Sequence, residues 1–378
     1  MRRAVDGFEK EYLDNRVITQ LAMRTAGAAS TQRIVKKLST CFLPGQLSVV
    51  GDSFIANRKP LTVNSIPSTV KSLEEAAKFA FERYPLDYSS ALGSVCASEN
   101  FITITCNHCV GDGGYLKDLM RVITTDEKPV IHSRLPLSWL EHDKGIADKL
   151  FEIPRYRTDP KMTRIHPHPG GSSSRVNTIR STLPIGSRPK GLTERQWVSI
   201  LAAYCSFSGD IGGLGLGICY NLRPTLKKSE QGLNVCNYFA CIPIHSDVSA
   251  DTTCGEVARR LREDLKYSEE NQYIHASFRV HERPIFKRYS GFHIDLSSVG
   301  EFHTSSDVKD VLLSFSPDAD LMVPHTMTYS YNGVLKTTFH YKLNQISTEE
   351  MQSISDKFSK ALRVVDMNQR FSDLVKVL

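Results

Sequence analysis

The sequence predicts an α/β (α+β) fold made of two subdomains, each a mixed sheet flanked by helices. Helical and strand patterns alternate in both halves, and short polar turns join consecutive strands, which favours mixed sheets over an all-parallel one. The length of 378 residues exceeds the ~150 residues of a typical single domain. With 40% hydrophobic and 23% charged residues, the composition is globular and excludes disordered, collagen-like and coiled-coil chains.

The first subdomain is expected over residues 1–153. Its clearest helix starts at a capping box, Ser72 with Glu75, and stops at Pro85. Polar residues 98–100 form the turn of a predicted hairpin. The elements expected here are helices over 7–23, 31–40, 72–84 and 115–123, and strands over 47–56, 91–97 and 101–108.

A linker is expected over residues 154–191. Six of the seventeen prolines and the run from Gly170 to Ser174 lie in this segment, and such composition interrupts helices and strands. The segment also carries eight basic residues against one acidic residue, whereas the rest of the chain is nearly neutral. The boundary between the subdomains is therefore placed here.

The second subdomain is expected over residues 192–378. Asn332-Gly333 is typical of a type I′ hairpin turn, and Ser347 with Glu350 forms another capping box. The elements expected are helices over 193–204, 253–267 and 347–364, and strands over 215–220, 238–243, 290–296, 311–315, 326–331 and 335–341.

The composition also bears on location and partners. No stretch approaches the ~18 apolar residues of a membrane span, and the N-terminus lacks the apolar core of a signal peptide. Nine cysteines, an odd number without paired CxxC motifs, favour free thiols in a reducing compartment. We therefore expect a cytoplasmic protein without a membrane span. Nucleic acid binding is not expected, because the positive charge is confined to one segment.

The sharpest local feature is the run from Cys106 to Gly114. It follows a predicted strand whose apolar face ends in the imidazole of His108, with Asp112 four residues on across a glycine turn. A histidine held in this way suits a general base, which needs a pKa near 7 and a fixed tautomer. A core histidine with a turn-forming aspartate is the other interpretation. Zinc binding or a cysteine nucleophile is disfavoured, because Cys109 points away from Cys106 and no second ligand pair follows.

This run has the pattern HxxxDG and resembles the active-site signature of one acyltransferase superfamily. That superfamily contains chloramphenicol acetyltransferase, fungal alcohol acetyltransferases, plant BAHD acyltransferases and the condensation domains of peptide synthetases. Further matches occur in family order over about residues 70–378. They are Tyr84 to Asp87 with the P-F-D-L lead-in, Tyr220 to Pro224 with the V-N-L-R strand, Cys236 to Tyr238 with the G-N turn, Ser297 to Gly300 with the S-N-x-G strand, and Tyr331 to Leu335 with the closing hairpin.

The resemblance implies two chloramphenicol-acetyltransferase-like subdomains with the active site between them. It implies an enzyme, a monomer because both subdomains supply one site, that moves an acyl group from coenzyme A to the hydroxyl or amine of a small molecule. Acetyl is the expected acyl group and no metal is expected. The implied roles are catalysis for His108, Asp112 and Gly113, and support of the site for Arg223, which is implied to form an ion pair with Asp112, and for Asn237 beside it. An oxyanion or pocket contact is implied for Ser298, Tyr329 or Tyr331, and contact with the coenzyme A phosphates for Arg175 and Arg180.

The chain also departs from the family pattern. It is shorter than usual, the first seventy residues match weakly, and the DFGWG motif of plant enzymes is absent. Cys236 stands where glycine is usual and Ser298 where asparagine is usual. Two alternatives therefore stay open, a non-catalytic binding or scaffold relative and a stand-alone condensation-domain-like protein that forms amides or esters.

Overall fold

The computed structural model describes residues 1–57, 59–131, 133–137, 164–165, 176–186, 190–211, 213–226, 232–234, 236–272, 274, 292–316 and 324–378. The chain divides into two compact units. Unit 1 comprises Met1–His142, Asn221–Phe239 and Glu301–Ala319, and unit 2 comprises Asp143–Tyr220, Ala240–Gly300 and Asp320–Leu378. None of the described helices has the length and apolar character needed to cross a membrane.

Both units are built from segments distant in sequence. Two segments of the second half, Asn221–Phe239 and Glu301–Ala319, belong to unit 1. The sequence predicted continuous subdomains over residues 1–153 and 192–378, and that division does not include these two segments in the first subdomain. The expected linker over 154–191 contains strand β9 (Val176–Pro184), which pairs antiparallel with β16 (Val334–Lys342), so this part of the segment is sheet.

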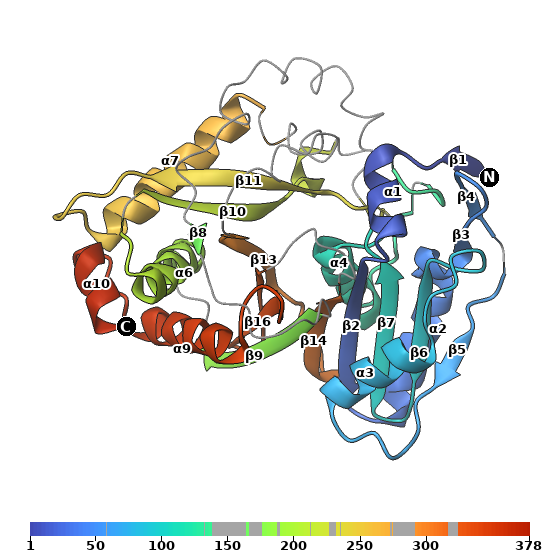
Figure 1. Ribbon diagram of the computed structural model, residues 1–378. Coiled ribbons are helices and arrows are strands. Elements are labelled where there is room, and N and C mark those ends of the chain that lie inside the picture. The colour runs from blue at the N-terminus through green and yellow to red at the C-terminus, as the bar shows by residue number, and fades with distance from the viewer. Residues whose placement is uncertain are drawn as a thin grey trace. The chain divides into compact units, whose positions relative to one another are not determined.

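Unit 1 contains a mixed five-stranded sheet in the order β14-β2-β7-β6-β5. Neighbouring strands pair antiparallel except β5 and β6, which are parallel. Its outer strand β14, from the second half of the sequence, lies beside β2 (Figure 1). The strands of unit 1 are β1 (Arg2–Ala4), β2 (Ile18–Thr25), β3 (Leu47–Val49), β4 (Ser53–Ala56), β5 (Val63–Ser65), β6 (Gly93–Ala97), β7 (Phe101–Asn107) and β14 (Val308–Ser316).

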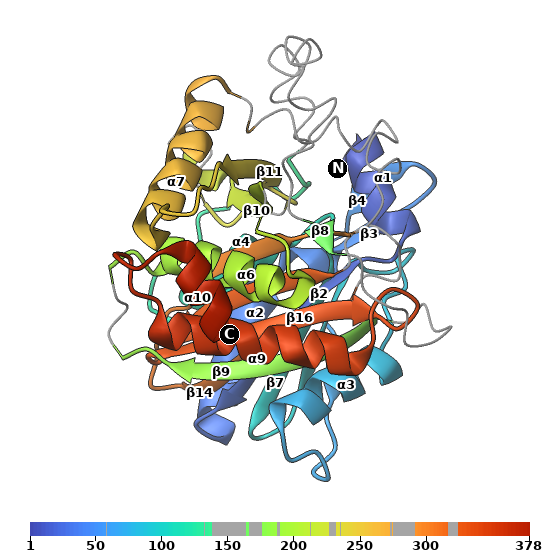
Figure 2. The ribbon, with the colours of Figure 1, turned by 60° about the vertical axis from the view of Figure 1, so that its left-hand side comes forward.

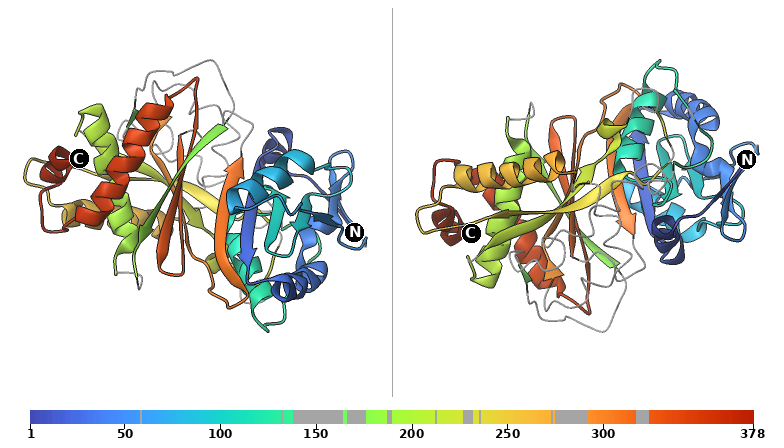
Figure 3. Two further views of the ribbon diagram at one scale, coloured as in Figure 1. Left: turned by 90° about the horizontal axis from the view of Figure 1, so that it is seen from below. Right: turned by 90° about the horizontal axis from the view of Figure 1, so that it is seen from above.

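Helices cover both faces of this sheet. Helix α3 lies on one face and α2 and α4 on the other, as Figure 3 shows. The predicted capping box is present at α3, where Ser72 accepts from the Glu75 backbone and Glu75 accepts from the Ser72 backbone. The helices are α1 (Gly7–Asp14), α2 (Ala28–Cys41), α3 (Leu73–Arg83) and α4 (Gly113–Thr124), with 3₁₀ turns at Leu43–Gln46 and Arg223–Thr225.

The helix predicted over 7–23 is wrong in its second part. Helix α1 ends at Asp14, Arg16 takes a positive φ of 48°, and β2 begins at Ile18. Strand β2 is paired on both sides, and seven of its eight residues are buried. A strand buried on both faces shows no alternation, so its apolar pattern resembles that of a buried helix.

Unit 2 contains a six-stranded sheet in the order β11-β10-β13-β15-β16-β9. Helices α6 and α9 pack on one face of it, and α10 packs against α6 (Figure 2). The edge of the Phe339 ring meets Phe358 of α9, with centroids 5.9 Å apart, and Thr328 donates to Gln196 of α6. The predicted hairpin turn is present, with positive φ at Asn332 and Gly333.

Unit 2 combines helices with a sheet, as predicted for both subdomains. They are α6 (Leu192–Ser208), α7 (Cys254–Glu270), α9 (Thr348–Val364), α10 (Phe371–Val377), β8 (Arg164–Ile165), β9, β10 (Leu214–Asn221), β11 (Phe239–Ser246), β12 (Phe292–His293), β13 (Asp295–Glu301), β15 (His325–Tyr331) and β16. The two mixed sheets with flanking helices confirm the fold class.

Candidate active site

His108 lies directly after the last residue of β7, in unit 1. All seven residues of β7 are buried, and the strand pairs with β2 and β6 on its two sides. The His108 backbone donates to the carbonyl of Val17, with N and O 2.8 Å apart. The imidazole therefore follows an interior strand that is paired on both sides, which is how a scaffold positions a reactive group.

Three aromatic rings surround the imidazole of His108. Tyr12 of α1 stacks on it, with centroids 4.9 Å apart and planes 20° apart. Phe239 and Phe315 meet it edge-on at centroid distances of 5.5 and 5.3 Å. The residue is only 7% exposed in this setting. Ring packing of this kind restricts the orientation of the imidazole, as a general base requires.

Asp112 ends the turn after His108 and caps helix α4. Its Oδ1 accepts from the Tyr115 backbone at 2.8 Å, as an N-cap aspartate does. Its Oδ2 accepts from the Tyr238 backbone at 2.8 Å. The side chain is 4% exposed, so both oxygens depend on partners within the protein.

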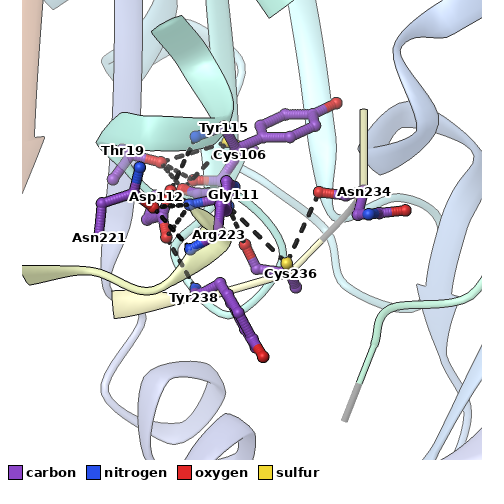
Figure 4. A network of polar contacts seen from close by, with 10 residues as sticks. All are labelled: Thr19, Cys106, Gly111, Asp112, Tyr115, Asn221, Arg223, Asn234, Cys236 and Tyr238. Atoms are coloured by element: carbon purple, nitrogen blue, oxygen red, sulfur yellow. Dashed lines mark hydrogen bonds and ion pairs between the residues drawn. The ribbon is translucent and has the colours of Figure 1, made fainter. Parts of the chain in front are cut away.

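Arg223 supplies the charge opposite Asp112, and the ion pair implied by the resemblance is present (Figure 4). Its Nη1 lies 2.8 Å from Oδ1 and 2.9 Å from Oδ2 of Asp112. Its Nη2 donates to the carbonyl of Cys236 at 3.1 Å, and its backbone donates to the side chain of Asn221. Together with the Tyr238 bond to Asp112, these contacts fix residues 221–223 and 236–238 against the turn after His108.

The ion pair decides the charge of both groups. Burial acts to raise the pKa of Asp112, but the charge and hydrogen bonds of Arg223 outweigh it and hold the pKa below its usual value. Burial also acts to lower the pKa of Arg223, and the charge of Asp112 raises it beyond its usual value. Both groups are therefore ionised at neutral pH.

The turn between His108 and Asp112 is itself buried and bonded. Thr19 of β2 donates to the carbonyl of Gly111, and its hydroxyl lies 3.2 Å from the sulfur of Cys106. Gly111 forms an isolated parallel bridge with Cys236. A Cβ at Gly111 would lie 2.5 Å from the Cys106 sulfur, so only glycine fits here.

Gly114→Ala is expected to lower the free energy of unfolding by about 1–3 kcal/mol. Its Cβ would lie 2.6 Å from Nη1 of Arg223 and 3.2 Å from Oδ1 of Asp112. The change should therefore displace the ion pair, although alanine normally favours a helix by about 1 kcal/mol. Denaturant unfolding would measure this, with Gly7→Ala in α1 as control because nothing lies within 4 Å of its Cβ. A stabilised Gly114→Ala variant would contradict the prediction.

The remaining site residues predicted from the sequence fall in both units. Gly113 is the first residue of α4, and Asn237 lies buried between the two residues that contact Arg223 and Asp112. Unit 2 contains Ser298 on β13, Tyr329 and Tyr331 on β15 and Arg180 on β9, whereas Arg175 lies outside the described residues.

Sequence reasoning missed the residues that hold the imidazole of His108. Tyr12, Phe239 and Phe315 come from three separate segments of the chain, and no local pattern links them. Asn107 was also missed. Its amide bonds to the backbone of Tyr12, the hydroxyl of Tyr88 and the backbone of Cys109, so it joins α1 to the turn. Its position directly before the histidine was the available signal.

Comparison with known proteins identifies the fold. No family model matches the sequence, and no curated protein does. The structure of polyketide synthase associated protein 5 from Mycobacterium tuberculosis is similar, with a TM-score of 0.64 and 14% identity over 96% of this chain and 98% of that one. The starter condensation domain of rhizomide synthetase RzmA has a TM-score of 0.62 and 11% identity over 98% of each chain.

A further similar structure is the epimerization domain from the third module of tyrocidine synthetase B. Its TM-score is 0.63 at 11% identity, over 100% of this chain and 96% of that one. The chain therefore has the fold of condensation domains. At these identities the likeness concerns the fold, and the chemistry has to be argued from the site.

Proposed function

We propose that the protein is an acyltransferase that uses a thioester donor, with His108 as general base. The observation that carries the proposal is the buried imidazole at the end of β7, held among three rings and followed by a turn clamped by the Asp112–Arg223 pair. A fixed imidazole beside a fixed turn suits proton transfer, because general-base catalysis depends on geometry first. The condensation-domain fold supports amide or ester formation.

The proposed reaction needs no covalent enzyme intermediate. His108 takes the proton of an acceptor hydroxyl or amine, and the freed oxygen or nitrogen attacks the thioester carbonyl. The tetrahedral intermediate then collapses with cleavage of its C–S bond, and the imidazolium returns the proton to the departing thiolate. Asp112 does not contact the reacting atoms in this proposal. It positions the turn, and Ser298, Tyr329 and Tyr331 are the candidate donors to the oxyanion.

Acyl-coenzyme A, most simply acetyl-coenzyme A, is the proposed donor, and a carrier-bound phosphopantetheine thioester is the other donor to test. Thiol release should be followed with each donor against a panel of alcohols, amines and polyamines. Thiol release that depends on an acceptor supports acyl transfer. The donor that releases thiol shows whether the acyl group comes from coenzyme A or from a carrier-bound phosphopantetheine. Absence of release with every pair would contradict the proposal.

A binding role is the second candidate function. The X-domain solved in a complex with OxyB from teicoplanin biosynthesis has the same fold, with a TM-score of 0.60 and 14% identity over 98% of this chain and 95% of that one. This fold therefore occurs in a domain that associates with another protein. This candidate would be favoured if calorimetry showed that the protein binds a thioester while no thiol release followed with any acceptor.

Arg180 is the proposed contact for the phosphates of coenzyme A. It is exposed on the edge strand β9, where it pairs with Thr338. Arg180→Gln is expected to raise the KM for acetyl-coenzyme A about tenfold, the effect of one charged hydrogen bond. The KM for acetyl-pantetheine, which lacks these phosphates, should not change. Lys190→Gln is the control because it removes one exposed charge from the same segment, and an unchanged KM in Arg180→Gln would refute the assignment.

A further inference from the structure

Unit 2 contains a second cluster of reactive side chains, separate from the residues of unit 1 described above. Cys219 of β10, Cys241 of β11 and Asp295 of β13 offer two sulfurs and a carboxylate oxygen that all lie within 4.8 Å of one another. Strands β11, β10 and β13 are consecutive neighbours in the sheet. Each of the three side chains therefore comes from a different strand of the same sheet.

Strand alternation explains why these three side chains meet. The residues next to them, Ile218, Ile242 and Leu296, are buried in the core, so the opposite face carries the two thiols and the carboxylate. Gly217 is paired with Asp295 in the parallel register of β10 and β13. A Cβ at Gly217 would lie 3.5 Å from Oδ1 of Asp295, so the glycine leaves space beside this oxygen.

The distance between the two sulfurs matches a tetrahedral site. The sulfurs of Cys219 and Cys241 are 3.8 Å apart. Two thiolates bound to one tetrahedral zinc ion, each at about 2.3 Å, are separated by about 3.8 Å. A disulfide would require the sulfurs to approach to about 2.0 Å. The cysteine pair is therefore already spaced for metal binding.

A histidine on the neighbouring strand orients the carboxylate of Asp295. Oδ2 lies 2.8 Å from Nδ1 of His325 on the neighbouring strand β15. Oδ1 is buried and has no hydrogen-bond partner among the described residues. A buried carboxylate oxygen without a partner is costly unless something binds it. Hydrogen bonds to a ligating carboxylate are the usual means of orienting it toward an ion.

We propose that Cys219, Cys241 and Asp295 bind a divalent ion of the zinc class, and that His325 positions the carboxylate. Two thiolates with one carboxylate favour zinc over the hard ions magnesium and calcium. Binding displaces two thiol protons to solvent, so two S–H bonds break and two metal–sulfur bonds form. Three protein ligands leave the fourth position for water or an added ligand.

Cobalt(II) added to the metal-free protein tests this site directly. One equivalent is expected to give thiolate-to-cobalt charge-transfer absorption and the intense visible bands of tetrahedral cobalt, and zinc should displace it. Cys219→Ala and Cys241→Ala should each remove at least half of the charge-transfer absorption. Asp295→Asn should weaken binding at least about tenfold. Cys205→Ala, which removes a buried thiol of α6 in the same unit, is the control and should bind as the parent does.

Alkylation of the unmodified protein provides a test that does not depend on variants. Cys219 and Cys241 are half-buried, whereas the other seven cysteines are buried. Iodoacetamide should therefore label these two first in the native state, and one equivalent of zinc should protect both. Peptide mapping would locate the labels. Unchanged labelling with zinc, or a Cys219–Cys241 disulfide in the zinc-saturated protein, would overturn the proposal.

Discussion

His108→Ala is expected to lower the rate of acyl transfer by about 10²–10⁴-fold, the usual contribution of a general base. The loss should appear in kcat, because the acceptor proton would lack its base in the transition state. The backbone bond from His108 to Val17 does not depend on the side chain. The measurement is thiol release under saturating donor and acceptor, with kcat and KM determined separately.

Loss of packing has to be separated from loss of the base. The alanine variant removes a ring that contacts Tyr12, Phe239 and Phe315, which lowers stability as well. His108→Phe keeps an aromatic ring but has no titratable nitrogen. It should lose activity as His108→Ala does while unfolding closer to the parent. His303→Ala, which removes an exposed histidine of unit 1, should leave the rate unchanged. A His108→Phe variant as fast as the parent would exclude the general-base role.

The elements predicted well from the sequence are those with local signals. The hairpin of β6 and β7 has a polar turn, and helices α3 and α9 have capping boxes that the structure contains. The predicted strand over 47–56 divides into β3 and β4, because Gly51 takes a positive φ and turns the chain back. A single glycine between apolar residues gives little warning of such a turn.

Contacts between distant segments could not be read from periodicity. Arg223 lies 111 residues from Asp112, and only the family resemblance connected them. Strand β14 joins the sheet of unit 1 although it lies in the second half of the sequence. The cluster of Cys219, Cys241 and Asp295 depends on the order of strands in the sheet, which the sequence does not specify. The expectation that no metal is bound rested on motif spacing and could not take that order into account.

Breaking the Asp112–Arg223 pair is expected to have the largest effect on stability. Asp112→Ala or Arg223→Ala should each lower the free energy of unfolding by about 3–5 kcal/mol, because each leaves one buried charge without its partner. Asp112→Ala should also release the backbone N–H groups of Tyr115 and Tyr238. The double variant should cost less than the sum of the two changes, since it leaves no unpaired charge.

A double-mutant cycle by denaturant unfolding measures this coupling. The exposed pair Arg259–Glu263 on α7 is the control, and its coupling should be only about 0.3–0.5 kcal/mol. Strict additivity at Asp112 and Arg223 would show that the two charges do not stabilise each other in solution.

The pH dependence of stability gives a separate test of the same pair. The pKa of Asp112 is lowered in the folded protein, so the folded state binds fewer protons at this group than the unfolded chain. The stabilisation is therefore complete above the unfolded pKa of about 3.9 and is lost as the pH falls through the folded pKa. Asp112→Asn, which keeps an acceptor oxygen but cannot ionise, should flatten the acid limb of the stability profile. If the stability of the parent and of Asp112→Asn fell equally with decreasing pH, Arg223 would not be holding Asp112 in its ionised form. The fixed position of the turn after His108 would then need another cause.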